Sequence, residues 1–243
     1  MGDFADGVRK LGDVLEAAVD RGKAHVGHLV EACEFAHHHF TDLARIGLTE
    51  DGQFADDQSR VIGTLFKLYP WEDMLRDEFA PHLQSSQTRF IEPPWKAILS
   101  NKGILPLLWQ MFPGHPNLLP AFFLADVAEA LTGGVAAPAV AAAFDAARDE
   151  LARGHVLKPI FSREGAGVSI WEQGREVVRT GDDSYSHHPM IVQGLAPLPD
   201  FGGFHPVLGA WIIGETCVGL GLREDQSRIT HNLSRFKPHF IEG

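Results

Sequence analysis

Cysteine is nearly absent from the 243-residue sequence, which has only Cys33 and Cys217 and no CxxC pair. So few cysteines argue against a disulfide framework and against a cysteine-based zinc site. No apolar run approaches the roughly 20 residues of a membrane-spanning helix, and the first ten residues, MGDFADGVRK, show no charged-then-apolar leader. We therefore expect a cytoplasmic protein without a membrane partner.

Several catalytic signatures are also missing. The sequence contains no HExxH zinc motif, no GxSxG nucleophile elbow and no Walker A loop. Histidine runs at residues 37–39 and 187–188 suggest a metal site. Adjacent residues of a helix point about 100° apart, however, so a run of neighbouring histidines does not present three ligands on one face. The sequence predicts no metal ligands, with a histidine-rich metal binder as a minor alternative.

Positive charge is scarce, with 21 Lys and Arg against 32 Asp and Glu and a net charge of −11. Residues 1–92 carry 9 basic against 17 acidic side chains, whereas residues 93–243 carry 12 against 15. This balance argues against a nucleic-acid partner. The more neutral second part is the better host for an anionic ligand.

The residue pattern divides the chain into a helical first part and a strand-rich second part. Helical periodicity or composition predicts helices at residues 8–34, 71–79, 102–112 and 135–153, whereas residues 49–59 are typical of a loop. A buried strand is predicted at 61–68 and a short extended stretch at 89–92. From residue 155 onward, Gly, Pro and Asp turns separate strand-like runs at 155–160, 168–171, 175–179, 190–195, 207–213 and 218–223.

This alternation predicts an α+β fold with mostly antiparallel sheets, preceded by an α/β-like segment. We expect residues 1–60 to be a helical N-terminal segment of unclear assignment and residues 61–92 to be a strand-helix segment. Residues 93–243 are expected to form the main lobes, with a hairpin turn at Gln173-Gly174.

One stretch, VLKPIFSREGAGVSIWEQG at residues 156–174, points directly at a ligand. It places Lys158 in an apolar run just before a glycine-containing loop at residues 162–167, which also carries Arg163. Lysine and arginine neutralise phosphate charge, and small residues let backbone N–H groups approach the oxygens. The pattern predicts a polyphosphate cradle, with an ordinary β-hairpin as the alternative.

Other basic residues are weaker candidates. Lys102 opens an apolar helix, where its charge opposes the helix dipole and favours a bound anion, although a solvated surface lysine is the more common case. Arg223 ends a strand and could bind phosphate bidentately. The following Glu224 and Asp225 suit either a metal or a simple polar turn, and residues 230–240 either line a nucleotide pocket or form an ordered tail.

Five collinear blocks resemble the C-terminal part of the glutathionylspermidine synthase family, which has a circularly permuted ATP-grasp fold. The resemblance covers about residues 60–243 and is carried by LFKLYPWEDMLRDEF (65–79), IEPPWKAILSNKGILPLLWQMFPGHPNLLPAFF (91–123), LKPIFSREGAGVSIWEQG (157–174), QGLAPLPDFGGFHPVLGAWIIG (193–214) and GLGLREDQSRITHNLSRFKPHF (219–240). It implies ATP-grasp nucleotide-binding lobes in residues 93–243 and a preATP-grasp-like segment in residues 61–92. In that family ATP phosphorylates a carboxylate, and an amine attacks the acyl phosphate to form an amide.

The resemblance also implies residue roles. Arg163 is expected to act in catalysis within the loop over the phosphates. Nucleotide contacts are expected from two lysines, the loop, the adenine hinge, an arginine and a further segment: Lys102, Lys158, Glu164, Gly165, Gln193, Gly194, Leu195, Ala196, Arg223, Arg228, Ile229 and Thr230. The loop reads SREGAGV where the family more often has GREGANV, so Ser162 and Gly167 depart from the pattern.

Magnesium is the other implied cofactor, but its family ligands come from Arg-x-Asp and Glu-x-Asn segments that precede the matched blocks. Neither segment occurs in residues 1–60. The implied function is an ATP-dependent carboxylate-amine ligase that acts on a peptide carboxylate and a polyamine or other amine. The alternative is a catalytically incomplete nucleotide-binding module, or half of a split enzyme whose partner chain carries the absent carboxylates.

Overall fold

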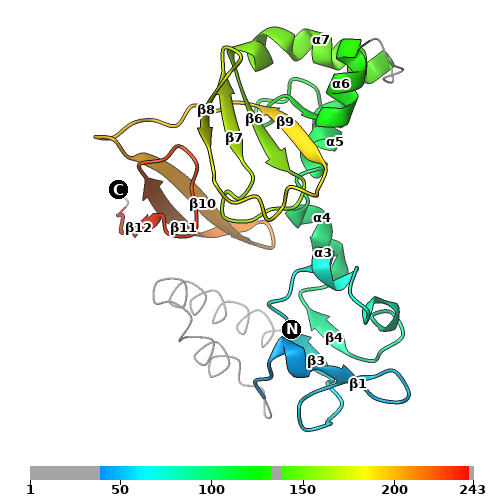
Figure 1. Ribbon diagram of the computed structural model, residues 1–243. Coiled ribbons are helices and arrows are strands. Elements are labelled where there is room, and N and C mark those ends of the chain that lie inside the picture. The colour runs from blue at the N-terminus through cyan, green and yellow to red at the C-terminus, as the bar shows by residue number, and fades with distance from the viewer. Residues whose placement is uncertain (1–38, 133–137, 241–243) are drawn as a thin grey trace. The chain divides into compact units, whose positions relative to one another are not determined.

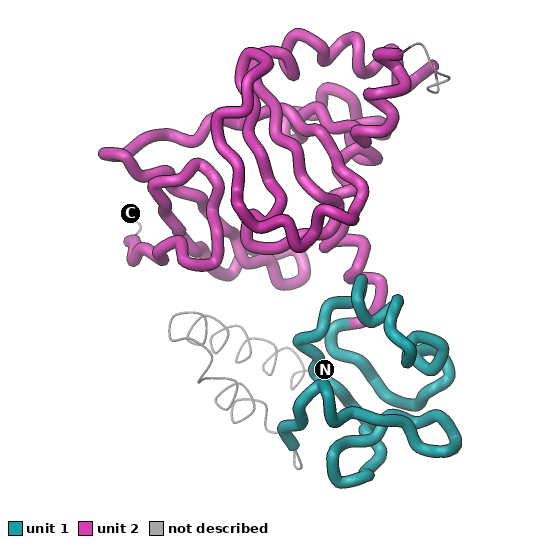
Figure 2. Tube along the Cα trace, in the orientation of Figure 1, with its two compact units in different colours: residues 1–92 teal, residues 93–243 magenta. Residues whose placement is uncertain are grey.

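The computed structural model describes residues 39–132 and 138–240 (Figure 1). The chain divides into two compact units, residues 1–92 and 93–243 (Figure 2). The division falls between Glu92 and Pro93, at the double proline that fixes an extended chain direction. The helix predicted at 8–34 lies outside the described residues.

The first unit is built from short elements. Its described part contains two pairs of strands, one four-residue α-helix and two 3-10 turns: η2 (Leu43–Arg45), β1 (Gly47–Leu48), β2 (Phe54–Ala55), β3 (Thr64–Phe66), α3 (Trp71–Met74), η3 (Ala80–His82) and β4 (Arg89–Ile91). Strands β1 and β2 pair antiparallel, and β3 and β4 pair parallel. Aromatic rings fill its core, where Phe54 meets Phe90 edge to face at 5.6 Å and Phe90 meets Trp71 at 5.5 Å.

Three predictions in this unit were wrong in extent. The predicted buried strand at 61–68 shortens to β3, and Val61 and Leu68 are exposed because β3 pairs only with β4 in a two-stranded sheet. The predicted helix at 71–79 shortens to α3, since Asp77 accepts hydrogen bonds from the Phe79 amide and the Tyr69 hydroxyl and turns the chain. The predicted loop at 49–59 contains strand β2.

The second unit holds the larger helices and sheets. Its elements are η4 (Pro94–Lys96), α4 (Ala97–Ser100), α5 (Ile104–Met111), β5 (Ala121–Phe123), α6 (Leu124–Thr132), α7 (Pro138–Arg153), β6 (Gly154–Pro159), β7 (Ser169–Glu172), β8 (Arg175–Arg179), β9 (Met190–Gly194), β10 (His205–Ile213), β11 (Thr216–Asp225) and β12 (Arg235–Lys237). No described helix has the length and apolar character to cross a membrane.

The main sheet of this unit has five antiparallel strands in the order β5-β9-β6-β7-β8. Helices α6 and α7 pack against one face, where Phe122 and Val192 meet Phe144 and Leu151 in the core (Figure 1). Side chains alternate between the two faces of a strand. Val156, Lys158 and Gln193 therefore belong to the opposite face, where Ile229 packs against Val156 and Ile170.

A second antiparallel sheet follows, in the order β10-β11-β12. Strands β10 and β11 form a long hairpin with a register shift between Trp211 and Ile212. The six strand runs predicted from residue 155 onward correspond to β6 to β11, and the predicted Gln173-Gly174 turn joins β7 to β8 with both residues at positive φ. These sheets confirm the predicted α+β fold with mostly antiparallel pairing.

Candidate functional site

A partly buried lysine lies on the sheet face opposite the two helices. Lys158 on β6 donates from Nζ to Gln193 Oε1 on β9 at 2.7 Å. Among the described residues it forms no ion pair, and burial lowers the pKa of its ammonium group below the ordinary 10.5. A buried cation whose described partner is neutral is stabilised by an anionic ligand, so this position favours phosphate binding.

Lys102, from the start of the α5 segment, reaches the same strand end. Its backbone N–H donates to Ile160 O at 2.8 Å, which ties the segment before α5 to the residues just after β6. Its Nζ donates to the carbonyl oxygen of Ser162 at 2.8 Å and to Ser162 Oγ at 2.9 Å. Lys102 therefore contacts the first residue of the glycine loop, residues 162–167, and Lys158 lies on the strand that leads into it.

The glycine loop has a strained, closely held backbone. Glu164, Gly165 and Gly167 all have positive φ, at 54°, 75° and 65°. The amides of Ala166, Gly167 and Val168 are already bonded to protein carbonyls. Fewer amides of the loop are therefore free than the sequence predicts. At the apex, the Glu164 and Gly165 N–H groups donate to no described residue.

Thr180, just after β8, anchors the C-terminal side of the glycine loop. Its Oγ1 donates to Gly165 O at 2.7 Å and accepts from the Val168 amide at 3.1 Å. The neighbouring carbonyl of Asp182 accepts from the Gly167 amide at 2.8 Å. No sequence pattern singles out Thr180, because its partners are backbone atoms that the hairpin brings together.

The glycine loop packs on the segment after β11. An ideal Cβ built on Gly165 would lie 2.7 Å from Thr230 O and 2.8 Å from Ile229 Cγ2, so only glycine fits between them. Arg228 in the same segment forms an ion pair with Glu172 at 2.7 Å, and this hydrogen bond lowers the pKa of the Glu172 carboxyl group. Three of the predicted residues therefore meet at the loop apex, Gly165, Ile229 and Thr230, whereas Arg228 contacts the end of β7.

The predicted hinge, residues 193–196, continues from β9 beside Lys158. The Gly194 amide donates to Pro120 O at 2.8 Å, and the Leu195 amide donates to Gly154 O at 3.1 Å. Gly194 is buried against Leu119, Pro120 and the Glu150 carboxylate, whereas Ala196 is exposed. The hinge is thus held by backbone bonds on both sides and leaves Ala196 at the surface.

Arg223 is occupied by protein carbonyls. Its Nη2 donates to the backbone oxygen of His231, and to those of Asn232 and Ser234 at 3.3 Å each. Its guanidinium lies 5.0 Å from the ring centroid of Phe236. This arrangement fixes the loop between β11 and β12, and the phosphate contact expected of Arg223 stays a prediction.

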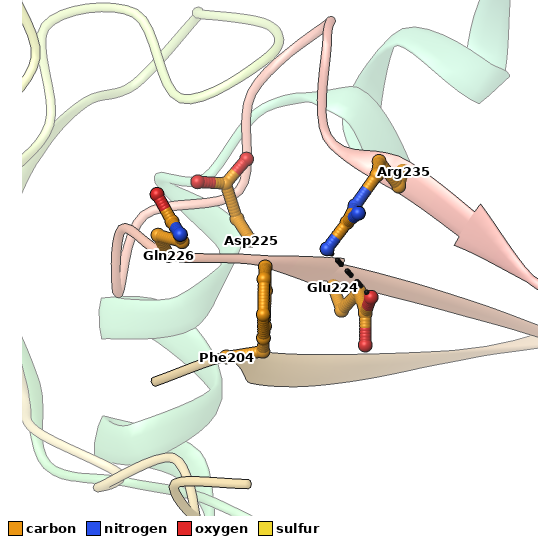
Figure 3. Close-up of a pocket in the computed structure, with 5 residues that line it drawn as sticks. All are labelled: Phe204, Glu224, Asp225, Gln226 and Arg235. Carbon is orange, nitrogen blue, oxygen red and sulfur yellow. Dashed lines mark ion pairs between the residues drawn. The ribbon is translucent and has the colours of Figure 1, made fainter. Parts of the chain in front are cut away.

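A polar pocket of about 270 Å³ opens on the β10-β11-β12 sheet, lined by Phe204, Glu224, Asp225, Gln226 and Arg235 (Figure 3). The end of β11 is the only part of this pocket that also belongs to the expected nucleotide site. Its carboxylates are engaged, since Glu224 pairs with Arg235 at 3.1 Å and Asp225 accepts from Ser234 Oγ at 2.5 Å. These bonds favour the polar-turn interpretation of Glu224 and Asp225 over a metal site.

The histidines of the two runs that lie within the described residues have structural roles. His188 is buried and packs against Tyr185 and Phe161. In residues 39–132 and 138–240, one group has the ligand spacing for a metal ion, formed by His39, Asp56 and Asp57 in the first unit. Its carboxylates are already paired with Arg60 and Arg45, and the Arg60 hydrogen bond lowers the pKa of Asp56 to about 2.

The structure thus gathers most of the predicted residues around one sheet face and one loop. Lys102, Lys158, Gln193 and the glycine loop are linked by direct hydrogen bonds or adjacent strands. Arg163 and Glu164 are exposed at the loop apex. Sequence reasoning missed Thr180 and Glu172, and it treated Ser162 only as a departure from the family pattern.

Comparisons with known proteins show the family of this chain. The family model described as glutathionylspermidine synthase preATP-grasp matches residues 23–242, so the match begins well before the resembling blocks. A putative acid–amine ligase of Haemophilus influenzae is 34% identical over 238 residues, covering 93% of this chain and 56% of that protein.

Two longer relatives match with lower identity. Trypanothione synthetase of Crithidia fasciculata is 29% identical over 204 residues, covering 74% of this chain and 28% of that protein. The bifunctional glutathionylspermidine synthetase/amidase of Escherichia coli is 26% identical over 223 residues, covering 82% of this chain and 32% of that protein. The chain therefore spans about half of one of these relatives and a third or less of the others. With nearly its whole length matched by the family model, this chain belongs to the glutathionylspermidine synthase family.

Proposed function

We propose that this chain supplies the ATP-binding lobes of an ATP-dependent carboxylate-amine ligase. The observation that carries the proposal is the partly buried Lys158 ammonium group, which donates to the neutral Gln193 amide on the sheet face opposite helices α6 and α7. Bound ATP would provide the negative charge that this lysine lacks among its described neighbours. The relatives named as synthetases and as an acid–amine ligase support the same class of reaction.

Each predicted group takes a role in this proposal. Lys102 and Lys158 neutralise phosphate charge, and the Glu164 and Gly165 amides at the loop apex donate to phosphate oxygens. Residues 193–196 read the adenine edge through backbone and side-chain polar groups. Arg163 stabilises the charge that develops on the transferred phosphoryl group, as an exposed arginine on a loop can do. Arg228, Ile229 and Thr230 complete the nucleotide contacts, with Ile229 and Thr230 packed against Gly165 of the loop.

Magnesium does not fit the described residues of this site. Glu172 and Glu224 are each paired with arginine, Asp225 is bound by Ser234, and Asp182 accepts two hydrogen bonds from Ser184. The single described group with ligand spacing for a metal, in the first unit, shares no residue with the site. We therefore assign no catalytic step to a magnesium ion held by this chain.

A second candidate function follows from that observation. A chain that binds nucleotide but lacks carboxylates for the metal would be an incomplete module, or half of an enzyme completed by a partner chain. The ligase and the incomplete module differ in whether this chain turns over substrate by itself. Steady phosphate release by this chain alone, with glutathione, a polyamine, ATP and Mg²⁺, would exclude the incomplete module.

Nucleotide binding itself is tested by calorimetry with ATP in the presence of Mg²⁺. Lys158→Ala and Lys102→Ala should each weaken binding by about 1–3 kcal/mol, which is about 5- to 150-fold in Kd, because each removes a charged hydrogen bond. Lys96→Ala is the matched control, since its ammonium group lies over the Trp95 ring and outside the proposed site. Equal affinity in all three variants would exclude the proposed phosphate site.

A further inference from the structure

Ser162, the first residue of the glycine loop, places a hydroxyl group beside the Lys102 ammonium group. Two oxygens of this serine accept hydrogen bonds from Lys102 Nζ, the carbonyl oxygen at 2.8 Å and Oγ at 2.9 Å. A glycine, which the family pattern more often has at this position, would offer the carbonyl oxygen alone. The serine therefore adds a second contact to the lysine and a polar group to the start of the loop.

The donor and acceptor capacities of the two groups fix the direction of this contact. An ammonium group donates and cannot accept, so Ser162 Oγ accepts from Lys102 with a lone pair. A hydroxyl group also carries one hydrogen of its own to donate. Within residues 39–132 and 138–240, no acceptor receives a hydrogen bond from Ser162 Oγ. The hydroxyl hydrogen is therefore directed away from Lys102 and is available to a ligand.

Backbone hydrogen bonds hold both partners in place. The Lys102 N–H group donates to Ile160 O at 2.8 Å, two residues before Ser162. Asn101 Oδ1 accepts from the Gly103 amide at 2.8 Å and shapes the turn that leads from Lys102 into α5. Lys102 and Ser162 are both partly buried. Because backbone and side chains are tied together in this way, the hydroxyl group loses little freedom when it binds a ligand.

The charge at this contact favours an anionic ligand. Lys102 carries a positive charge, and the two Ser162 oxygens that it contacts are neutral. An ammonium group that donates to a hydroxyl oxygen polarises the O–H bond, which strengthens the hydrogen bond that the hydroxyl donates in turn. Since Oγ lies 2.9 Å from Nζ, two oxygens of one phosphate group can accept from the lysine and from the serine.

We propose that the Ser162 hydroxyl group donates a hydrogen bond to a phosphate oxygen of the bound nucleotide, next to the contact made by Lys102. This contact rests on the proposed function, because the phosphate belongs to the ATP assigned to the site. Ser162 is then a phosphate-binding residue in its own right, and Lys102 orients its hydroxyl group.

A matched pair of variants isolates the hydroxyl group, since threonine and valine have the same shape and only threonine keeps the hydroxyl. Calorimetry with ATP and Mg²⁺ should give Ser162→Thr nearly the wild-type Kd, and Ser162→Val a Kd about tenfold higher, because a hydrogen bond to a charged group is lost. Ser162→Ala should resemble Ser162→Val. The φ of Ser162 is not positive, so alanine adds no backbone strain. Ser100→Ala is the control, since its exposed hydroxyl group donates to Ala97 O within α4.

A double variant separates a direct phosphate contact from an effect that passes through the lysine. Lys102→Ala combined with Ser162→Ala should bind ATP more weakly than Lys102→Ala alone, because the serine contact is still lost. The additional loss should be smaller than the loss that Ser162→Ala causes in the wild type, since the lysine no longer orients the hydroxyl group. Equal affinity of the single and double variants would overturn the contact, because Ser162 would then act only through Lys102.

The remaining outcomes distinguish this contact from the proposed function. Equal ATP affinity of Ser162→Thr and Ser162→Val, with normal binding by the wild type and weaker binding by Lys158→Ala, would overturn the serine contact alone. A wild-type chain that binds no ATP would overturn the proposed function and the contact together. Circular dichroism and thermal unfolding check that the compared variants are equally folded.

Discussion

At the residue scale, the account depends on the charge state of Lys158. Desolvation disfavours the ammonium form, which is why burial lowers the pKa of this side chain. The glutamine amide oxygen at 2.7 Å offers a hydrogen bond but no full negative charge. An ATP phosphate near this lysine would raise its pKa again, so binding and protonation are coupled.

The lowered pKa of Lys158 predicts a specific pH dependence of stability. Between its folded pKa and the ordinary 10.5, the unfolded chain binds more protons, so the free energy of unfolding rises with pH across that window. Lys158→Met removes this contribution. The wild type should therefore gain stability relative to the variant as pH climbs through the lowered pKa toward 10.5, as measured by urea unfolding. A pH-independent difference over that range would show that Lys158 is not desolvated.

A second residue-scale prediction compares two glycines with φ of 75°. An alanine at Gly174 meets nothing within 4 Å, whereas an alanine at Gly165 would clash with Thr230 O and Ile229 Cγ2. Gly174→Ala should therefore cost about 1 kcal/mol from backbone strain alone. Gly165→Ala should cost about 1–3 kcal/mol more from overpacking and should weaken ATP binding. Denaturant unfolding measures both costs, and equal costs would contradict the contact between the loop and Thr230.

At the element scale, the glycine loop is a pre-shaped structure held by the end of the β8 strand. With its backbone bonded to Thr180 and to the Asp182 carbonyl, the loop presents the Glu164 and Gly165 amides at its apex, where they donate to no described residue. A loop fixed in this way loses little conformational entropy on binding, which favours affinity.

Replacing Thr180 tests this role of the loop. Thr180→Val keeps the side-chain shape but removes the hydrogen bonds to Gly165 O and the Val168 amide. We expect a loss of about 1–3 kcal/mol in stability, faster hydrogen exchange at the Val168 amide and weaker ATP binding. Thr180→Ser should restore most of the affinity. Thr132→Val, which removes a hydroxyl bond within α6, is the control. Unchanged ATP affinity in Thr180→Val would remove the loop from the binding account.

The sequence predicted most strands and two longer helices of the second unit, because those elements carry a local signal, but it missed helix α6. The apolar runs between turn residues correspond to β6 through β11, and the alanine-rich stretch includes α7. The predicted strand at 61–68 and the predicted helix at 71–79 were too long, because the length of each element depends on its tertiary partners. Strand β3 has one neighbour only, and the Asp77 hydrogen bonds end the helical segment. Strands β5 and β12 were missed because three residues hold too little periodicity.

The candidate site was also only partly visible in the sequence. Lys102, Lys158 and the glycine loop were singled out by residue type and by family resemblance. The bonds from Lys102 to Ser162 and from Thr180 to the loop span 60 and 15 residues, so no local pattern reveals them. For the same reason the sequence did not show that carbonyls of the following loop occupy Arg223.

At the scale of the whole molecule, the chain contains one unit that carries every proposed ATP contact. Lys102, Lys158, residues 162–167, residues 193–196 and residues 228–230 all belong to residues 93–243.

Hydrogen–deuterium exchange with and without ATP tests the central claim most directly, because it locates the ligand on the intact chain. The account predicts slower exchange at the glycine loop, in β6 and β9, and around residues 228–230. Exchange at the polar pocket of Phe204 and Gln226 should not change, which provides an internal control. No protection at saturating ATP, or protection confined to that pocket or to residues 39–92, would contradict the account.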